Sequence, residues 1–498
     1  MDGGVTAGYP SYRDSEGQQV LYFFLGFVAI LLSVSGLAIS LPFGLVATFG
    51  LTLGMVTLFP ASAPVIILAA FMLQNWVIAT YADTVPDDAA FDAMRGANFV
   101  ILMTAYGAFL LASFQRRVGQ IPHMKSWLLA SLGLLGVITF YTGLGAIAGE
   151  PRDALVYFRN TIGAVACFHV GLVAASLYRV ELSRPLTWLA AILVCYGYFE
   201  LFFTLDFLSL FGGDLYLERD MRRQFDTGFW EKALEQTGFV YLGLRDAMTA
   251  DFFNTSLFGD IFPKVFRIGG PNFHPISFAY GLVMTSIFLL LRGKWLIPLL
   301  AFPLLLIIGS KGAMVLFFLA LLVQVGLKVL PVRTTLGLLV LAACLWISAA
   351  IVIGSRSGDY HVLGFFAGLR EFLGNPLGHG IGIGGNLSSS SEHLDWTLAQ
   401  TSGSTDVPVE SAVGVMLYQM GIGALGLFAF LAALTRTCYV LFRETGERDF
   451  LFGFVGIVVL SANAVLQEEA FYSPLALGFC LLVTGQAIGS SLRSPTSR

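Results

Sequence analysis

The chain has 498 residues, of which 56% are hydrophobic and 12% charged, and its formal net charge at pH 7 is −4. Ordinary soluble proteins carry about 25% charged residues, so this composition excludes the soluble, fibrous and disordered classes. The weak acidic balance gives no indication of a nucleic-acid partner. We therefore expect an all-α, polytopic bundle of transmembrane helices.

A polar tail, residues 1–19, precedes the first apolar run. A membrane-spanning helix needs about 20 predominantly apolar residues. On that criterion residues 20–211 contain seven predicted spans, which lie near residues 20–36, 37–58, 63–81, 93–114, 127–148, 155–178 and 188–211. Residues 212–272 follow as a first long loop that mixes charged and aromatic residues.

In the second half of the chain, a group of predicted spans is again followed by a long loop. Residues 273–354 contain four predicted spans, near 273–291, 295–309, 313–327 and 336–354. A second long loop, residues 355–410, is rich in glycine and serine. Residues 411–489 contain the last three spans, near 411–434, 450–466 and 475–489, and residues 490–498 form a second tail. The sequence thus predicts about 14 spans and two long loops.

Basic residues alternate with acidic ones along the short loops. One set of loops holds the positive charges Arg116, Arg117, Lys125, Arg179, Arg184, Arg292, Lys294, Lys328, Arg333, Arg436, Arg443 and Arg448. The loops of the other parity are mostly acidic, as at Asp87–Asp92 and Glu468–Glu469. Because basic loops stay in the cytoplasm, both termini are expected there and both long loops outside.

Cationic residues also collect on the predicted outer side, where that rule does not place them, and five of them are candidates for a binding site. They are Arg159, Arg267, Lys311, Arg356 and Arg370. Guanidinium and ammonium groups gathered at a membrane surface suit a diphosphate, which Arg binds as a bidentate fork and Lys as a point charge. The alternative for each residue is a snorkelling or salt-bridged side chain.

The second long loop contains a glycine-rich stretch, Asn375–Asn386. Gly380, Gly382 and Gly385 spell GxGxxG, but no predicted strand precedes them, so a dinucleotide-binding fold is excluded. Such a backbone can adopt positive φ repeatedly, which suits an anion-binding nest or a close approach by a sugar. A set of tight turns is the alternative.

Candidate proton acceptors on the outer side include His361 and Glu410. A carboxylate at the boundary of a span can serve as a general base, or it can stabilise the first turn of a helix. Glu200 and Asp206, within a predicted span, are candidates for a proton relay. No HExxH, Walker or CxxC motif occurs, and we expect neither a metal ion nor a cofactor.

Four short stretches in a fixed order carry a resemblance to a known family. They are Arg267 with Gly269-Gly270 and His274-Pro275, then Ser310–Ala313, then Asn375–Gly380, and finally Leu417-Tyr418 through Gly421–Gly423. In these stretches the sequence resembles the O-antigen ligase/polymerase superfamily of bacterial envelope glycosyltransferases. The resemblance covers mostly residues 267–434, with Tyr157–Asn160 as a further match in the first half.

The resemblance implies metal-independent, inverting transfer of a glycan from undecaprenyl diphosphate to a sugar hydroxyl, at the outer face of the bacterial inner membrane. The diphosphate would then be bound by Arg159, Arg267, Lys311, Arg356 and Arg370. Glu410 or His361 would accept the hydroxyl proton, and the sugars would contact His274, Asn375, His379 and Asn386. The partners would be the lipid-linked glycan, the bilayer and a copolymerase that regulates chain length.

One departure from the family bears on the reaction. Ligases place a His-Asn pair where this chain has Glu410-Ser411. That difference favours a polymerase of lipid-linked repeat units over a ligase that transfers glycan to lipid A-core or protein. A flippase for lipid-linked oligosaccharides is a further alternative, although its cations should line a passage reachable from both sides of the membrane.

Overall fold

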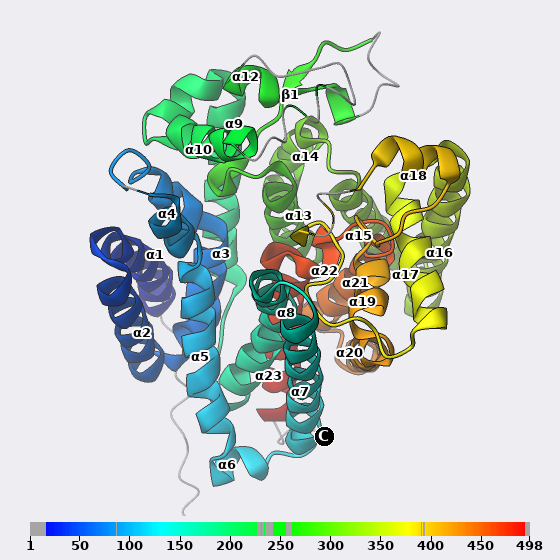
Figure 1. Ribbon diagram of the computed structural model, residues 1–498. Helices are drawn as coiled ribbons and strands as arrows, with labels where there is room; N and C mark the ends of the chain where they lie inside the picture. The colour runs from blue at the N-terminus through cyan, green and yellow to red at the C-terminus, as the bar shows by residue number, and fades with distance from the viewer. Residues whose placement is uncertain are drawn as a thin grey trace, which may run out of the picture.

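The computed structural model describes residues 16–493 except 86, 227–230, 232–233, 235–242, 255–260, 390 and 392–393. Most of the two predicted tails lies outside the described residues. Helices account for nearly all of the described secondary structure (Figure 1), and the described strands are one short antiparallel pair, β1 (Thr249–Ala250) and β2 (Val265–Phe266). The predicted helical fold class is confirmed.

The elements of the first half follow the apolar runs closely. In chain order they are α1 (Glu16–Ile39), α2 (Leu41–Leu58), η1 (Pro60–Ser62), α3 (Ala63–Ala79), α4 (Asp88–Arg95), α5 (Ala97–Ser113), α6 (Arg116–Gly119), α7 (Met124–Ala148), α8 (Pro151–Leu177) and α9 (Ser183–Ser209). The first long loop contains α10 (Gly213–Asp226), α12 (Leu244–Ala247), β1, η2 (Phe252–Asn254), β2 and η4 (Gly270–Asn272). This loop is therefore structured over much of its described length.

The second half is also helical. Its elements are α13 (Pro275–Leu291), α14 (Leu296–Ile308), α15 (Lys311–Val329), α16 (Val332–Ser357), α17 (Tyr360–Gly374), α18 (Trp396–Ser402), α19 (Ala412–Met420), α20 (Ile422–Thr445), α21 (Arg448–Asn463), α22 (Glu469–Tyr472), η6 (Pro474–Gly478) and α23 (Phe479–Arg493).

Ten of the described helices are long and apolar enough to cross a membrane, or eleven when the bent pair α4–α5 is one span. The protein is therefore a multi-pass membrane protein, but the predicted count of about 14 spans is not confirmed. Two predicted spans, α13 and α14, are apolar but short. The span predicted at 411–434 is broken at Gly421, which has φ +50° and separates α19 from α20.

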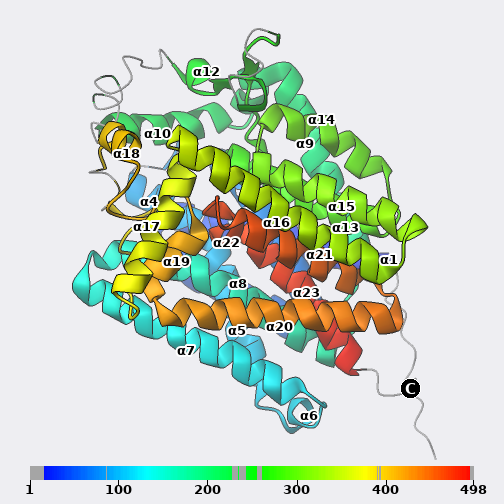
Figure 2. The ribbon, with the colours of Figure 1, turned by 90° about the vertical axis from the view of Figure 1, so that its right-hand side faces the viewer.

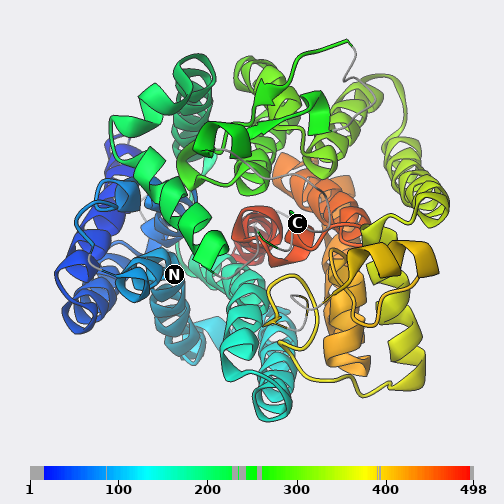
Figure 3. The same ribbon diagram turned by 45° about the horizontal axis from the view of Figure 1, so that its top comes forward.

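The centre of the bundle is the contact between α8 and α23 (Figures 1 and 3). Glycines bring the two backbones together, since a Cβ at Gly171 would lie 2.2 Å from the Leu482 carbonyl oxygen and one at Gly485 would lie 2.3 Å from that of Phe168. Close packing of small residues is a common way for membrane helices to associate. It fixes α8, which carries Arg159, in the middle of the molecule.

The two ends of the bundle differ (Figure 2). At the end that we call the basic end, Arg184 pairs with Glu16 at 2.5 Å, and Lys294 Nζ donates to Ser183 Oγ at 3.0 Å. Both described ends of the chain lie there, because Gln486 near the end of α23 donates to the Val180 carbonyl at 3.3 Å. The opposite end, which we call the cavity end, carries α4, α10, α17 and α18.

Candidate functional site

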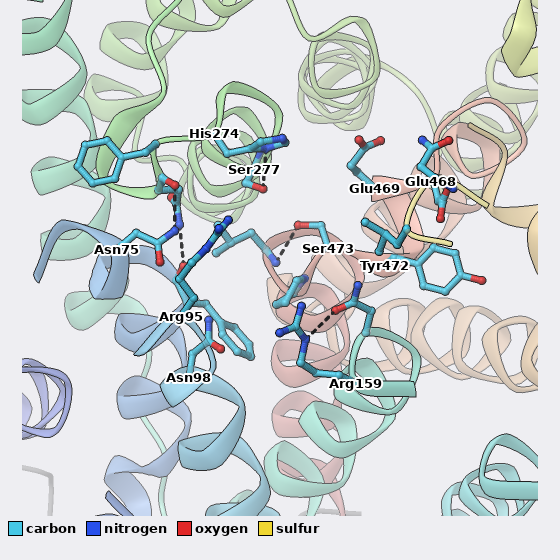
Figure 4. A pocket seen from close by; sticks show the side chains of 18 of the residues that line it. Asn75, Arg95, Asn98, Arg159, His274, Ser277, Glu468, Glu469, Tyr472 and Ser473 are labelled. Carbon is cyan, nitrogen blue, oxygen red and sulfur yellow. Dashed lines mark hydrogen bonds between the residues drawn. The ribbon is translucent and has the colours of Figure 1, made fainter. Parts of the chain in front are cut away.

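A polar cavity of about 350 Å³ opens at the cavity end (Figure 4). Its walls come from segments that are far apart in the sequence. The lining residues from helices are Phe71 and Asn75 of α3, Arg95 of α4, Asn98 of α5, Arg159 and Asn160 of α8, Tyr216 and Asp220 of α10 and Ser277 of α13. The remaining lining residues belong to the segments 272–274, 386–387, 468–469 and 472–475. The arrangement is a product of the tertiary fold, not of a local motif.

One wall is cationic. Arg95 ends α4, and its Nη1 pairs with Asp220 Oδ1 of α10 at 3.0 Å and with Asp92 Oδ1 at 3.9 Å. Arg159 lies in the third turn of α8, and its Nε donates to Asn160 Oδ1 at 3.4 Å, while no described carboxylate lies within 4 Å of it. An arginine inside a membrane helix that faces a cavity indicates a functional site.

The opposite wall is acidic, and its buried member is Glu468 (Figure 4). The Tyr157 hydroxyl donates to Glu468 Oε1 at 2.5 Å, and the backbone N–H of Asn386 donates to Oε2 at 3.0 Å. Burial raises the pKa of Glu468 to about 7, against the opposing effect of these two hydrogen bonds. Glu468 therefore ties α8 to the end of the glycine-rich loop.

Glu469 lines the same cavity, and its carboxylate accepts a hydrogen bond from its own backbone N–H. Its carboxylate forms no ion pair within 4 Å with a described residue. Burial raises the pKa of Glu469, and so does the charge of Glu410, whereas Arg267 and His361 act in the opposite direction. Glu469 lines the same cavity as Arg95 and Arg159, and a partly desolvated carboxylate with a raised pKa in such a site is suited to accept a proton.

The predicted catalytic residues Glu410 and His361 are brought together by the fold. His361 Nδ1 lies 3.6 Å from Glu410 Oε2. Glu410 has φ +63°, a strained conformation for a residue other than glycine, and its N–H donates to Asn386 Oδ1 at 3.1 Å. Neither residue lines the cavity, although both are near enough to Glu469 to shift its pKa.

Of the five predicted diphosphate-binding residues, Arg159 alone is among the residues that line the cavity. Arg267 lies nearby: its Nε donates to the Ile308 carbonyl at 3.0 Å, and its charge lowers the pKa of His274. Lys311 is exposed at the start of α15, three residues after Ile308.

The other two predicted cations lie elsewhere. Arg356 is exposed in the last turn of α16. Arg370 donates from Nη1 to Ser404 Oγ at 2.7 Å and from Nη2 to the Thr405 carbonyl at 2.8 Å, so it fastens a loop. Because their helices α16 and α17 pack away from α8, these two residues do not join the arginine wall (Figure 1).

Two of the four predicted sugar-binding residues line the cavity, namely His274 and Asn386. His274 caps α13, and its Nδ1 accepts from the Ser277 N–H at 3.2 Å, so the neutral ring presents Nε2–H as a donor. His274 as a residue is exposed where it lines the cavity. Burial by the surrounding protein, followed by the charges of Arg267 and Arg95, lowers the pKa of His274 to about 4.

The remaining two predicted sugar-binding residues lie outside the cavity lining. Asn375 Nδ2 donates to the Gly378 carbonyl at 3.3 Å and closes a turn. His379 stacks on Tyr418 with ring centroids 4.2 Å apart, and its Nε2 lies 3.6 Å from Glu371 Oε2. Both residues therefore have local partners within the second loop and the helices beside it.

The glycine-rich stretch does adopt positive φ, with +102° at Gly380 and Gly382 and +94° at Gly385. A Cβ at Gly385 would lie 2.0 Å from the Tyr157 hydroxyl, so only glycine fits there. Two backbone amides of the stretch already donate hydrogen bonds within the protein. The Gly380 N–H donates to the Gln419 carbonyl and the Gly385 N–H donates to the Pro408 carbonyl, both at 2.8 Å. The stretch is thus a docked series of turns that sets Asn386 in place, and these amides are not available as an anion nest.

Sequence reasoning did not identify Arg95, Glu468 or Glu469 as site residues. Arg95 carried the same signal as Arg159, a positive charge on the predicted outer side. Glu468 and Glu469 looked like ordinary acidic loop residues. The feature that distinguishes Glu468 and Glu469 from other acidic loop residues is the packing of α22 against α8, which the sequence does not reveal.

Glu200 is a structural anchor for the segment that carries Arg267 and His274. Its Oε1 accepts from the Gly269 N–H at 2.8 Å, and its Oε2 accepts from the Gly270 N–H at 2.7 Å. Two oxygens that each hold a backbone amide in a buried position account for this intramembrane carboxylate without a proton relay.

Among the described residues, no group of three or more His, Cys, Asp or Glu side chains is arranged to hold a metal ion. Arginines and amides line one side of the cavity, and the carboxylates of Glu468 and Glu469 line the other. No family model, curated protein or solved structure matches this chain.

Proposed function

We propose that this protein is a membrane glycosyltransferase that polymerises undecaprenyl-diphosphate-linked repeat units at the outer face of the bacterial inner membrane. The observation that supports this best is the cavity with Arg95 and Arg159 on one wall and Glu469 on the other. A reaction that expels a diphosphate and activates a hydroxyl requires a cationic group and a base, on opposite sides of the sugar that is transferred.

The arginine wall is the proposed binding site of the leaving group. When the bond between the sugar C1 and the phosphate oxygen breaks, the electron pair passes to the diphosphate and its negative charge grows. Arg95 and Arg159 stabilise that charge with charge-assisted hydrogen bonds in a partly dry site. The amides of Asn75, Asn98 and Asn160 line the same wall and can donate further hydrogen bonds to phosphate oxygens.

Glu469 is the proposed general base. It accepts the proton of the acceptor hydroxyl while that oxygen forms the new bond to C1, on the face of the sugar opposite the leaving group. Attack from that face inverts the configuration at C1. Burial raises the pKa of Glu469, which makes it a stronger base than an exposed carboxylate for this step.

Glu410 and His361, the bases favoured by the sequence, are proposed to act at a greater distance from the sugar. Their 3.6 Å contact and their effect on the pKa of Glu469 suit a route by which the proton leaves Glu469. The Nε2–H of His274 and the amide of Asn386, which both line the cavity, are proposed to hold sugar hydroxyls.

The proposal is tested by reconstitution of the full-length protein in liposomes with a lipid-linked repeat unit. A ladder of products is expected, and it should persist in EDTA. A single shifted band with a lipid A-core acceptor would identify a ligase instead. Substrate that crosses the bilayer without any product would identify a flippase, and both of these results contradict polymerisation.

A further inference from the structure

A second cavity, of about 510 Å³, which we call the side cavity, adjoins the first at the arginine wall. The two cavities share Arg95 and Arg159 and the amides of Asn75, Asn98 and Asn160. The residues that line only the side cavity are Asp92, Phe99, Leu102, Arg152, Val156 and Gly163. A ligand whose diphosphate is bound at the arginine wall can therefore place a second group in the side cavity.

The lining of the side cavity has an excess of positive charge. Arg95, Arg152 and Arg159 line it together with one carboxylate, Asp92, and Asp92 Oδ1 lies 3.9 Å from Arg95 Nη1. Among the described residues, no carboxylate lies within 4 Å of the guanidinium group of Arg152 or Arg159. The charge that the described protein groups leave without a partner is therefore that of Arg152 and Arg159.

Arg152 is placed where a cation does not stabilise its own helix. It is exposed in the first turn of α8, directly after Pro151. The helix dipole is positive at this end and favours an anion there. Arg152 and Arg159 are seven residues apart on one face of α8, or about 10 Å along the axis, so they suit two separate negative groups better than a single one.

The amides of the side cavity suit the hydroxyls of a sugar. Asn98 of α5 and Arg159 of α8 stand on facing sides of this space (Figure 4). Asn75 Nδ2 donates to the Asn272 carbonyl at 2.9 Å, whereas the side chain of Asn98 forms no hydrogen bond with a described residue. Asn98 can therefore hold a phosphate oxygen with its N–H groups and a sugar hydroxyl with its Oδ1 at the same time.

We infer that the side cavity binds an acidic sugar of the lipid-linked repeat unit, with the negative group of that sugar at Arg152. This inference rests on the proposed function, and it makes the polymer an anionic polysaccharide. A guanidinium group binds a carboxylate or a phosphate through two parallel hydrogen bonds, so a uronic acid and a phosphorylated sugar offer the same chemistry. The exposure of Arg152 brings this part of the cavity into contact with water, which suits a hydrophilic ligand.

The charge of Arg152 distinguishes an acidic sugar from a neutral one. Phe99 and Leu102 of α5 and Val156 of α8 offer apolar surface on which the C–H face of any sugar ring can pack. The amides would serve a neutral sugar equally well. A neutral sugar would nevertheless leave the Arg152 guanidinium without a negative partner, whereas an acidic sugar completes its interactions.

The first experiment measures the binding of four undecaprenyl diphosphate probes to the full-length protein in nanodiscs. One probe carries no sugar, and the others carry a disaccharide that ends in glucuronic acid, in glucose 6-phosphate or in glucose. At least one acidic probe is expected to bind about tenfold more tightly than the glucose probe, or by about 1.4 kcal/mol. The tighter of the two acidic probes identifies the negative group as a carboxylate or a phosphate.

The two ways in which this experiment can fail are distinct. Equal affinities for the acidic probes and the glucose probe would overturn the inference and leave the proposed function standing. Absence of binding by all four probes would contradict the proposed function as well.

The second experiment repeats these measurements on Arg152→Gln. The preference for an acidic sugar should disappear, and the affinity for the probe without sugar should not change. Arg245→Gln is the matched control, because Arg245 is exposed in α12, which packs against α10 at the same end of the bundle, and it lines neither cavity. A preference that persists in Arg152→Gln, or one that is lost equally in Arg245→Gln, would overturn the assignment.

The third experiment fills the side cavity. Val156 is half-buried and lines it, whereas Leu155 is 63% exposed and lines neither cavity. Val156→Trp should weaken binding of the three probes that carry sugars about tenfold, because the indole occupies the space for the ring, and should leave the probe without sugar unaffected. Leu155→Trp should change none of the affinities. An equal loss for the probe without sugar in Val156→Trp, or no loss for any probe, would refute this placement of the sugar.

Discussion

The two ends of the helix bundle use charged residues in different ways. At the basic end, Arg292 is paired with Asp449, and Arg184 is paired with Glu16. Lys294 donates to the hydroxyls of Ser183 and Thr187. At the cavity end, Arg159 and Glu469 form no ion pair with a described partner and line one cavity from opposite walls.

The cavity end also holds paired charges, since Arg95 pairs with Asp220 and Asp92, so the difference between the two ends lies in the unpaired Arg159 and Glu469. A paired charge at the membrane boundary joins two helices and is satisfied without a ligand. An unpaired charge that faces a cavity is partly removed from water. It therefore pays a desolvation free energy that no interaction with another protein group offsets. Clusters of such groups mark sites where a ligand completes the interactions. The candidate site follows from this contrast, since both ends contain the same residue types.

The largest effect is expected from Arg159→Gln. Loss of one cation from the leaving-group site should lower polymerisation about 100-fold or more, since the removal of a single transition-state donor costs about 3–4 kcal/mol. The protein level in the membrane should not change. Arg292→Gln is the matched control, because it breaks an ion pair at the basic end and should lower thermal stability but not the rate per folded molecule. Normal long-chain polymer from Arg159→Gln would remove this arginine from the mechanism.

Glu469→Gln should be nearly as severe, but in a different parameter. Loss of a general base lowers turnover by about 10²- to 10⁴-fold, whereas binding of undecaprenyl diphosphate to the arginine wall should persist. Single-turnover measurements with the lipid-linked repeat separate the two quantities. Glu410→Gln is the comparison: full activity in Glu469→Gln together with inactivity in Glu410→Gln would restore the base expected from the sequence.

Glu468 should make stability depend on pH near neutrality. Its pKa is raised from 4.5 to about 7 in the folded protein, so the folded state holds this proton more tightly than the unfolded state does. The corresponding stabilisation is complete below pH 4.5 and is lost as the pH rises through 7, with a total on the order of 3 kcal/mol. Thermal unfolding in detergent micelles between pH 4.5 and 8 measures the slope. Glu468→Gln should flatten it, and an unchanged slope would assign the titration to another group.

The smallest effect concerns His274. Because its pKa is lowered to about 4, the ring stays neutral at the pH values at which an ordinary histidine gains a proton, near 6.5. Its contribution to stability is present above pH 6.5 and is lost as the pH falls toward 4. His274→Gln should lower activity only a few-fold, by the roughly 1 kcal/mol of one hydrogen bond, and should not shift the pH profile of activity. A shift of the acidic limb of that profile would show that His274 titrates.

The helical fold was predictable because each long apolar run forms at least one helix, and the run itself is a local property of the sequence. The span count was not predictable, because tertiary contacts set the helix ends. At Gly421 the helix breaks where the Ile422 N–H donates to the Pro376 carbonyl at 2.8 Å, a contact with the second long loop that no periodicity reveals.

The site was predictable where a residue violated a general rule or belonged to a stretch that carries the resemblance, as His274 and Asn386 do, which both line the cavity. Arg159 stood out as a positive charge on the predicted outer side, and the structure places it in the cavity. Arg356 and Arg370 gave the same signal but lie on helices that pack elsewhere. Glu469 gave no signal, because an acidic residue is ordinary in an outer loop and its function depends on what faces it across the cavity.

The hydrogen bond between Tyr157 and Glu468 joins residues that are 311 positions apart in the sequence. It has a consequence for biosynthesis. The arginine-bearing helix α8 leaves the ribosome long before the acidic wall exists, so a nascent chain holds the cations without the base. The enzyme we propose would therefore remain inert until its last helices insert, and ribosomes stalled short of residue 468 would yield membrane-embedded chains that cannot transfer sugar.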